Sequence, residues 1–414
     1  MTSARRVALA ALKIWRTEKT FADSILAQEL AKPKLSARDR GFALKLFYGV
    51  LRNLTLLDFW IDSLRQTRLD AALRDILRLG LYQLLLLKIS AHAAVFEAVE
   101  LAGKRQRPLA NAILRAALKA RDNLEHNARK QPLSIQFSHP EFLLTRWQHH
   151  FGEEAVCELC VWNNRPAPVL ARINRLKISS LDFRRAYPGS LILQNRENFV
   201  ELTGISPKAI ASGDFYIQDP STAMACDLLG PRPGEKILDT CAAPGGKTGL
   251  LAEQMGNVGT IVACDRDPAR INLLRDNLSR LGVTIASLVK HDWEEKIPGA
   301  ISSQAPFDRI LIDAPCSNTG VMRRRVDVRW RLRPGDFGRM QKRQIAIVEA
   351  AVNLLKPGGT LVYSTCSIEP EENEQVAEFI SSGSSALQRE QQDQLLPFRN
   401  HFDGAFAVRF VRTR

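Results

Sequence analysis

Residues 237–248 read ILDTCAAPGGKT, and this stretch decides the fold of the chain. Its apolar start is typical of a buried strand, and the glycines that follow lead into a helix near residues 247–255. Glycines at such a turn let backbone N–H groups approach a polar or anionic ligand closely. The stretch is not a P-loop, because Cys241 stands where GxxxxGK[ST] needs its first glycine. A dinucleotide-binding GxGxxG is also absent, so the stretch predicts a different ligand-binding α/β domain.

Apolar runs of strand length recur along the chain and alternate with helical patterns. They cover residues 236–239, 260–265, 286–289, 309–313 and 360–364. Alternating strands and helices favour a doubly wound α/β domain with a parallel sheet. In such domains ligands bind beyond the carboxyl ends of the strands, so the residues that follow each run are candidates for a functional site.

Acidic residues follow two of these runs. Asp265 ends the second run, 20 residues after Gly245, which is the spacing at which a carboxylate reaches ribose hydroxyls in Rossmann-like sites. Asp267 is the second candidate, and either aspartate can instead cap a helix. His291 and Asp292 end the next run, where they either contact an adenine edge or simply terminate the strand.

Two cysteines lie in polar loops after the last two runs. Residues 313–317 read DAPCS and residues 365–367 read TCS, which places Cys316 and Cys366 at strand ends. A lone cysteine is most often a small buried hydrophobe. Two cysteines in loops of this kind favour a shared crevice with the glycine-rich turn.

A pair of thiols beside a carboxylic acid suits one reaction in particular. A thiolate can add to C6 of a pyrimidine, which makes C5 nucleophilic toward an electrophilic methyl group. An acid directed at N3 stabilises the charge that develops, and a base then removes the C5 proton. Because a free thiol titrates near pH ~8.5, the site must lower that pKa or deprotonate the thiol in place. Lys247 and nearby arginines are sources of positive potential for this purpose.

The chain has 414 residues, enough for two to three domains of ordinary size. Its 45% hydrophobic and 25% charged residues exclude a disordered or collagen-like protein. The net charge of +14 is concentrated in residues 1–130, where 24 Lys/Arg face 12 Asp/Glu and leave about +2 (14 − 12) for the rest. This basic front end favours a nucleic-acid partner, with a solvated basic surface as the alternative.

The first 130 residues read as a compact helical domain. Residues 36–39 form a capping box at the start of one helix. Further helices are predicted near residues 54–64, 71–87, 93–102 and 108–120. The polar residues 121–136 predict a linker before a second module that runs to about residue 213, and the polar residues 379–394 predict a loop.

No apolar run approaches the ~20 residues of a membrane span, so no membrane partner is expected. The N-terminus predicts an amphipathic helix rather than a signal peptide, because Lys13 and Arg16 interrupt its apolar run. Cys157 and Cys160 form a CxxC without a second pair at zinc spacing, so we expect structural thiols on a helix and no metal. The scattered cysteines fit the reducing cytoplasm.

Three motifs carry a resemblance to a known family. They read DTCAAPGGKT (residues 239–248), DAPCSNTGVMRRRVDVRW (residues 313–330) and STCSIEPEEN (residues 364–373). They are similar to the RNA cytosine-C5 methyltransferases of the RsmB/NOP family. AHAAVFEAVELA (residues 91–102) and LANAILR (residues 109–115) resemble helices of NusB-like domains. Nearly the whole chain therefore resembles the bacterial RsmB (Sun/Fmu) type, which joins a NusB-like domain to a methyltransferase.

The resemblance implies a fold and an activity. It implies an α/β Rossmann-like class I methyltransferase core with an all-α N-terminal NusB-like domain. The domains expected are a NusB-like RNA-binding domain (residues 1–130), a linker and α/β pre-core RNA-recognition subdomain (131–212), and the methyltransferase domain (213–414). The expected reaction transfers a methyl group from S-adenosylmethionine to C5 of a cytosine in RNA. The expected RNA is 16S ribosomal RNA, and the reaction would pass through a covalent Cys–C6 adduct. We expect a cytoplasmic monomer.

The resemblance also implies roles for individual residues. Cys366 would be the nucleophile, Cys316 would help to resolve the adduct, Asp313 would lie near the methionine moiety and the target base, and Lys247 would assist at the base. Asp265 would hold the ribose hydroxyls and Asp292 would lie beside the adenine. The S-adenosylmethionine loop would consist of Cys241, Ala242, Ala243, Pro244, Gly245, Gly246 and Lys247. From the chemistry alone, Cys316 and Cys366 cannot be ranked.

The chain departs from the family pattern at Val326, where proline is usual in the loop after DAPCS. An arginine cluster follows Cys316, and we expect it to contact RNA phosphates, with a solvated loop as the alternative. Its members are Arg323, Arg324, Arg325, Arg329, Arg331 and Arg333. Two other functions stay open: methylation of tRNA by the same chemistry, and an RNA-binding adaptor with an inactive core.

Overall fold

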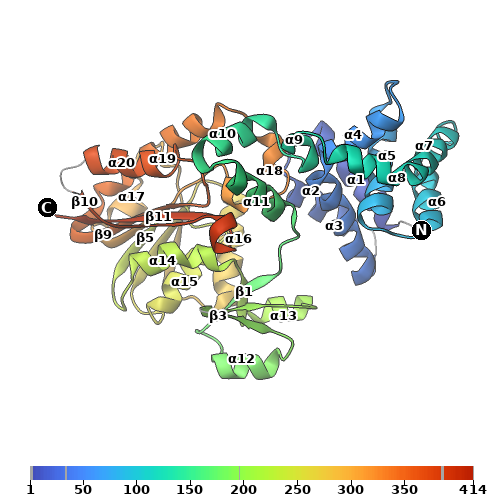
Figure 1. Ribbon diagram of the computed structural model, residues 1–414. Coiled ribbons are helices and arrows are strands. Elements are labelled where there is room, and N and C mark those ends of the chain that lie inside the picture. Colours follow the sequence, from blue (N-terminus) through green and yellow to red (C-terminus); the bar gives the residue numbers. More distant parts are fainter. Residues whose placement is uncertain (1–2, 33–34, 195, 384–386, 414) are drawn as a thin grey trace. The chain divides into compact units, whose positions relative to one another are not determined.

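The computed structural model describes residues 3–32, 35–194, 196–383 and 387–413 (Figure 1). The chain forms two compact units. Unit 1 comprises Met1–Pro166 and Met322–Leu332, and unit 2 comprises Ala167–Val321 and Arg333–Arg414. The predicted domain limits at residues 130 and 212 stay predictions.

Unit 1 is helical. Its helices are α1 (Ala4–Thr17), α2 (Ala22–Ala31), α3 (Ala37–Arg52), α4 (Leu54–Leu64), α5 (Ala71–Leu81), a π-helical turn (Tyr82–Leu86), α6 (Ala91–Leu101), α7 (Arg107–Lys119), α8 (Arg121–Ala128), α9 (Leu133–Gln136), α10 (Glu141–Phe151), α11 (Glu153–Asn164) and α18 (Val328–Arg331). Ser36 is the N-cap of α3, as predicted: its Oγ accepts a hydrogen bond from the backbone N–H of Asp39 at 3.1 Å and donates to the Asp39 carboxylate at 2.7 Å. The predicted CxxC lies on α11, with Cys160 buried.

The predicted linker between residues 121 and 136 is wrong in this unit, since α8 and α9 occupy it. Their sequence is largely polar, but Leu124 and Ala128 of α8 are buried in the helical core, and tertiary hydrogen bonds also hold the two helices in place. The indole N–H of Trp60 donates to the carbonyl of Leu124 at 3.1 Å, and Thr55 Oγ1 donates to the carbonyl of Ser134 at 2.8 Å. Both contacts come from α4, which no local pattern in residues 121–136 reveals.

Residues 322–332 contribute to the core of unit 1. Val326 is fully buried within the helical core cluster. Asp327 Oδ2 accepts the backbone N–H of Ala22 at 2.9 Å, and the indole N–H of Trp330 donates to the carbonyl of Leu51 at 2.9 Å. The segment is therefore a packed part of the unit rather than a free loop.

This packing corrects the expectation for three of the clustered arginines. Arg329 is fully buried and donates to the carbonyls of Ser138 and Asn163 at 3.2 and 3.1 Å. Arg331 donates to three backbone carbonyls of unit 1 at 2.8–3.0 Å, and Arg323 stacks 3.9 Å above the ring centroid of Trp162. The prediction that these side chains contact RNA phosphates is wrong for Arg323 and Arg329, which are buried, while the terminal nitrogens of Arg331 are occupied by backbone carbonyls.

Unit 2 begins with a small antiparallel sheet in the order β2-β3-β1-β4. Its strands are β1 (Leu170–Ile173), β2 (Leu191–Leu193), β3 (Arg196–Glu201) and β4 (Phe215–Ile217), joined through α12 (Ser180–Ala186) and α13 (Pro207–Ser212). A separate cluster that includes Phe183, Val200 and Phe215 forms its core.

The remainder of unit 2 is built on a seven-stranded sheet in the order β10-β11-β9-β8-β5-β6-β7. Its strands are β5 (Lys236–Asp239), β6 (Thr260–Asp265), β7 (Ala286–Lys290), β8 (Phe307–Asp313), β9 (Leu355–Thr365), β10 (Leu387–Leu395) and β11 (Ala405–Arg412). The five predicted strands, β5 to β9, are parallel to one another. Their carboxyl-terminal ends agree within one residue with the predicted runs, although β9 begins five residues earlier than predicted. β5, β6 and β8 are largely buried on both faces, as is typical of a parallel sheet, whereas β7 is partly exposed.

Helices cover both faces of this sheet (Figure 1). One layer contains a 3-10 turn (Pro220–Thr222), α14 (Ala223–Leu229), α15 (Gly246–Gln254) and α16 (Pro268–Leu281). The other contains α17 (Gly299–Ser302), α19 (Asp336–Val352) and α20 (Glu374–Gly383). Neighbouring side chains of β5 alternate between the layers, with Ile237 in the first and Leu238 in the second. A short 3-10 turn (Thr319–Val321) and α21 (Pro397–Asn400) complete the unit.

The polar loop predicted for residues 379–394 is wrong where the structure describes it, since residues 379–383 belong to α20; residues 384–386 of this prediction lie outside the described part of the chain. Residues from Leu387 form β10, which pairs antiparallel with β11 at the edge of the sheet. Exposed edge strands lack the apolar alternation that a sequence reading uses, and pairing with β11 supplies their stability instead. Among the described residues no helix is both long and apolar enough to cross a bilayer, and no metal-binding cluster of acidic, histidine or cysteine side chains occurs among them.

Candidate active site

The candidate site lies in unit 2 where the strand order reverses. From β5 the chain proceeds to β6 and β7 on one side, and then crosses to β8 and β9 on the other. The loops after β5 and β8 therefore diverge, which opens a crevice at the carboxyl ends of the strands. Asp239 and Asp313, which end these two strands, lie on its two sides.

The glycine-rich stretch forms the loop between β5 and α15, as predicted. Gly245 has φ +104°, a backbone conformation that favours glycine, and it precedes the first turn of α15. A Cβ atom on Gly246 would lie 2.7 Å from the ring of Tyr216, so only glycine fits there. Side chains of α16 hold the loop: Asn277 Nδ2 donates to the carbonyl of Pro244 at 2.8 Å, and Arg270 donates to the carbonyl of Ala243.

The acidic residues after β6 have separate tasks. Asp267 caps α16, because its Oδ1 accepts the backbone N–H of Ala269 at 2.8 Å. Asp265 is buried at the end of β6 and has Arg270 Nη1 3.3 Å from its Oδ2. Asp292 is partly exposed beyond β7, 3.8–3.9 Å from the guanidinium groups of Arg266 and Arg343. Of the two candidates for binding the ribose hydroxyls, Asp267 is used as a helix cap, whereas the Asp265 carboxylate lies at the end of β6.

Three buried acceptors along this crevice make no hydrogen bond within the described part of the chain. They are Asp239 Oδ1, Asp265 Oδ2 and His291 Nε2. Burial raises the pKa of Asp239 to about 7, although Thr248 donates to its other oxygen at 2.7 Å. S-adenosylmethionine carries an amino group, two ribose hydroxyls and an adenine amine as donors. These unsatisfied acceptors and the close backbone of residues 241–247 fit that molecule.

Lys247 and Asp313 form an ion pair across the crevice. Lys247 Nζ lies 2.7 Å from Asp313 Oδ2, and Ser364 Oγ donates to Asp313 Oδ1 at 3.1 Å. Burial alone disfavours the ammonium, but the Asp313 carboxylate outweighs it and raises the pKa of Lys247 above its ordinary value. Lys247 is therefore charged at neutral pH and is not a neutral base.

Cys316 and Cys366 meet in the same crevice, as the sequence predicted for a shared site. Their sulfur atoms are 3.2 Å apart, and the Cys366 thiol lies 3.3 Å from Asn318 Oδ1. Cys316 is buried, whereas Cys366 is partly exposed. The hydrogen bond with Cys366, together with burial, raises the pKa of Cys316 well above its ordinary value. Cys316 thus holds its proton and can donate a hydrogen bond to a thiolate on Cys366.

A buried glutamate joins the two cysteine loops. Glu372 Oε2 accepts the backbone N–H of Ser317 at 2.8 Å and the Gln344 side-chain amide at 3.0 Å, while its Oε1 accepts Ser367 Oγ at 2.9 Å. The backbone N–H of Gly320 also donates to the carbonyl of Cys366 at 3.0 Å. This network fixes the separation of the two thiols. Glu372 lies within the third quoted motif, yet its spacing gave no indication of this role.

A small cavity of about 40 Å³ adjoins Lys247 and Cys366. Besides these two side chains it is lined by Ser221, Thr222 and Asp403, which sequence reasoning did not single out. They come from the loop before α14 and from the turn before β11, and only the paired strands bring them to the site. A volume of this size accommodates about one water molecule, so a larger ligand requires the lining side chains to move.

Comparisons with known proteins agree with this architecture. The model of the 16S rRNA methyltransferase RsmB/F family matches residues 226–411, the NusB family model matches residues 2–119, and the ferredoxin-like domain model of RsmF/B-like methyltransferases matches residues 139–188. The predicted Rossmann-like core with an all-α N-terminal NusB-like domain is confirmed.

Individual relatives extend over nearly the whole chain. The probable ribosomal RNA small subunit methyltransferase B of Bacillus subtilis is 33% identical over 91% of this chain and 87% of the relative. Ribosomal RNA small subunit methyltransferase B of Proteus mirabilis is 35% identical over 92% of each chain. The crystal structure of a methyltransferase homologue from Pyrococcus horikoshii, 30% identical, superposes with a TM-score of 0.58 over 67% of this chain and 97% of that one. The chain belongs to the RsmB/F family of S-adenosylmethionine-dependent RNA methyltransferases.

Proposed function

We propose that this enzyme methylates C5 of a cytosine in small-subunit ribosomal RNA through a covalent adduct with Cys366. The observation that carries the proposal is the placement of two thiols 3.2 Å apart beside the Lys247–Asp313 ion pair. Methylation of an exocyclic amine or a ribose hydroxyl needs no such thiol pair. The names of the curated relatives support ribosomal RNA as the substrate.

The nucleophile is Cys366. It is the more exposed of the two thiols, and Cys316, whose pKa is raised, stabilises the Cys366 thiolate by donating a hydrogen bond to it. The thiolate attacks C6 of the cytosine, forming the C6–S bond and shifting the electrons of the C5–C6 double bond toward N3. A proton from the Lys247–Asp313 pair passes to N3 and neutralises the charge that develops there.

Residues 241–247, Asp265 and Asp292 would hold S-adenosylmethionine, which would supply an electrophilic methyl group for C5. After methylation the proton on N3 returns to the Lys247–Asp313 pair. Cys316 gives its proton to the sulfur of Cys366 as the C6–S bond breaks, and takes up the proton released from C5. Both thiols end protonated, and the base leaves as 5-methylcytosine.

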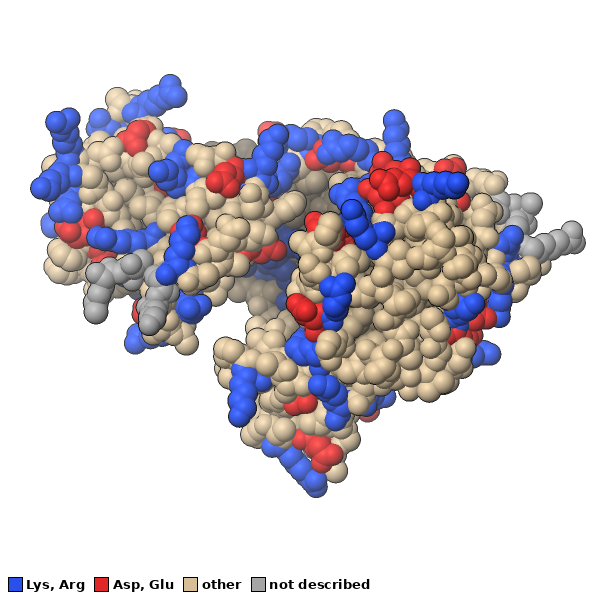
Figure 2. All heavy atoms as spheres, turned by 180° about the vertical axis from the view of Figure 1, so that it is seen from behind, with Lys and Arg blue, Asp and Glu red and all other residues tan. Residues whose placement is uncertain are grey.

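Unit 1 supports the RNA-binding part of the proposal. Lys and Arg side chains project from much of its surface in Figure 2, with fewer acidic side chains among them. Such a surface contacts phosphates without reading sequence. We propose that residues 1–130 dock the RNA and that the enzyme acts as a monomer on an unpaired cytosine.

Labelled S-adenosylmethionine and unmodified small-subunit ribosomal RNA test the reaction directly. We expect label at C5 of cytosine with the wild type, none with Cys366→Ala, and a trapped protein–RNA adduct with Cys316→Ala. Cys157→Ala, which removes a thiol from α11 in unit 1, is the matched control and should retain activity. An adduct trapped by Cys366→Ala would reverse the two roles. Transfer to tRNA alone would overturn the proposed substrate, and no transfer to any RNA would favour an adaptor.

A further inference from the structure

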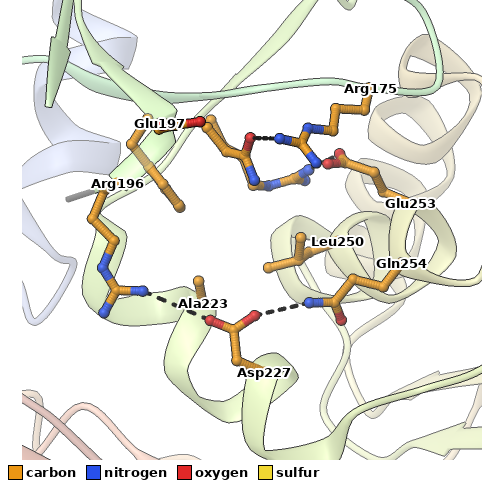
Figure 3. A pocket seen from close by; sticks show the side chains of 11 residues that line it. Arg175, Arg196, Glu197, Ala223, Asp227, Leu250, Glu253 and Gln254 are labelled. Carbon is orange, nitrogen blue, oxygen red and sulfur yellow. Dashed lines mark hydrogen bonds and ion pairs between the residues drawn. The ribbon is translucent and has the colours of Figure 1, made fainter. Parts of the chain in front are cut away.

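A second, larger pocket lies in unit 2 away from the two thiols. It has a volume of about 380 Å³ and is formed by β1, β3, α14 and α15 (Figure 3). Its size is within the range of small-ligand sites. Its polar lining includes Arg172, Arg175, Arg196, Asp227, Glu253 and Gln254. None of these residues takes part in the proposed methyl transfer.

One wall of the pocket is rigid and already satisfied. Arg172 is buried, forms an ion pair with Glu253, and donates to Gln218 Oε1 at 3.0 Å. It also lies 3.5 Å from the carbonyl of Gly246, the first residue of α15. This wall therefore connects the pocket to the cofactor loop, but its own charges are paired and leave little capacity for a ligand.

The opposite wall holds a guanidinium and a carboxylate that form a loose ion pair without a hydrogen bond between them (Figure 3). Arg196 Nη1 lies 3.7 Å from Asp227 Oδ2, beyond hydrogen-bond distance, and the Arg196 guanidinium donates no hydrogen bond within the described residues. Gln254 Nε2 donates to Asp227 Oδ1 at 2.8 Å and orients the carboxylate toward the pocket (Figure 3). Burial raises the pKa of Asp227, as expected for a carboxylate whose solvation is incomplete.

A carboxylate beside a guanidinium suits a flat ring whose edge presents two adjacent hydrogen-bond donors and, next to them, two adjacent acceptors. A carboxylate can accept two donors from one edge, and a guanidinium can donate to two neighbouring acceptors. Among the RNA bases only guanine presents this order, with its N2 amine and N1–H beside O6 and N7. Adenine and cytosine would place a ring acceptor against the Asp227 carboxylate. The apolar side chains of Ala223 and Leu250 lie between the two walls and can contact the ring faces.

We propose that this pocket binds a guanine nucleotide of the RNA substrate, with Asp227 accepting from N1 and N2 and Arg196 donating to O6 and N7. Arg175, exposed at the edge of the pocket, supplies a positive charge for the phosphate. The inference rests on the proposed action on RNA. Gln254 lies seven residues after Lys247 on α15, about 10 Å along the helix axis, so a short stretch of one strand can reach both sites.

Binding of free nucleotides to the full-length protein tests the recognition without any turnover. We expect GMP to bind more tightly than AMP, CMP or UMP, and IMP, which lacks the N2 amine, to bind at least several-fold more weakly than GMP. Asp227→Asn and Arg196→Gln should each reduce GMP affinity about tenfold or more. Asp182→Asn makes the same chemical change on exposed α12 and should have no effect. Equal binding of all four nucleotides, or unchanged affinity in both pocket variants, would overturn the proposal.

RNA oligonucleotides distinguish a strand-borne guanine from a free nucleotide. Each oligonucleotide carries one target cytosine in a uridine context and one guanine moved along the strand. We expect wild-type methylation to have a lower KM at one guanine position and Asp227→Asn to lose that preference with kcat retained. Methylation that ignores the guanine while GMP still binds selectively would assign the pocket to a free nucleotide. Absence of C5 methylation in every oligonucleotide, with selective GMP binding intact, would reject the proposed function and not the pocket.

Discussion

The sulfur atoms of Cys316 and Cys366 lie 3.2 Å apart although 50 residues separate them in the chain. Both thiols follow neighbouring parallel strands, in which Asp313 of β8 is paired with Ser364 of β9. Each cysteine is two or three residues beyond this pair, so strand register brings the two loops together. Glu372 then holds the loops at this separation through contacts with Ser317 and Ser367.

The two thiols should differ in reactivity toward iodoacetamide. The thiolate is the reactive form, and the pKa of Cys316 is raised by its hydrogen bond with Cys366 and by burial, so Cys316 should be alkylated more slowly than Cys366 at neutral pH. Peptide mass spectrometry over a time course measures both rates in one sample. Cys226, whose pKa burial also raises, serves as an internal unreactive reference. Faster alkylation of Cys316 would contradict the assignment of Cys366 as nucleophile.

Asp313→Asn should reduce the methylation rate by about 10²–10⁴-fold, the usual contribution of a positioned acid or base. Asparagine retains the size of the side chain but removes the charge that keeps Lys247 protonated and hydrogen-bonded at 2.7 Å. Single-turnover kinetics with saturating RNA separates this effect from binding. Asp336→Asn, at the start of α19, is the control and should retain the wild-type rate. A rate within threefold of wild type for Asp313→Asn would exclude the proposed proton transfer.

Asp239 should make the free energy of unfolding fall as the pH rises, the opposite of the usual effect of a carboxylate. Burial raises its pKa to about 7, so between about pH 4 and pH 7 the folded protein holds a proton that the unfolded chain has lost. Its contribution therefore declines as pH rises through this window. Asp239→Asn should become progressively more stable relative to wild type from pH 4 to pH 7, by up to roughly 4 kcal/mol. Urea unfolding of both proteins at several pH values measures the difference, and a constant difference would show that Asp239 is ionised throughout.

Glu372→Ala should lower the free energy of unfolding by about 3 kcal/mol and slow methylation strongly, because Ser317, Ser367 and Gln344 lose their shared acceptor in a buried site. Glu372→Gln retains an oxygen for the Ser317 N–H and the Gln344 amide, and its NH₂ can donate to the Ser367 hydroxyl. It should therefore keep most of the stability. Urea unfolding and initial methylation rates compare the two variants. Equal stability of Glu372→Ala and wild type would show that other contacts hold the cysteine loops.

Arg329→Gln should destabilise unit 1 by about 3–5 kcal/mol, because the buried carbonyls of Ser138 and Asn163 lose their donors. Arg333→Gln replaces an exposed member of the same arginine cluster and should change stability by less than about 0.5 kcal/mol. Thermal unfolding followed by circular dichroism separates the two cases. If Arg329→Gln weakened RNA binding without loss of stability, Arg329 would be an RNA contact after all.

The amino-acid sequence by itself determined the central strands and the glycine-rich loop, and it marked the residues of the candidate site. β5, β6, β8 and the second half of β9 (residues 359–365) are largely buried, so they appear as apolar runs whose ends are visible without a structure. Gly245 and Gly246 are also visible in the sequence as a glycine pair. Gly245 has a positive φ, and Gly246 packs closely against the ring of Tyr216. Cys316 and Cys366 could be recognised because each lies directly after such a run.

Only the tertiary structure decided which polar residues face a ligand and which hold the fold together. The arginine cluster after Cys316 looks uniform in sequence, yet Arg329 is fully buried while Arg333 is exposed. Polar segments such as α8 and β10 are held by partners distant in the chain, so no local pattern marks them. Asp227 and Arg196 face one pocket for the same reason, because hydrogen bonds and ion pairs form between groups that folding brings together from unrelated positions.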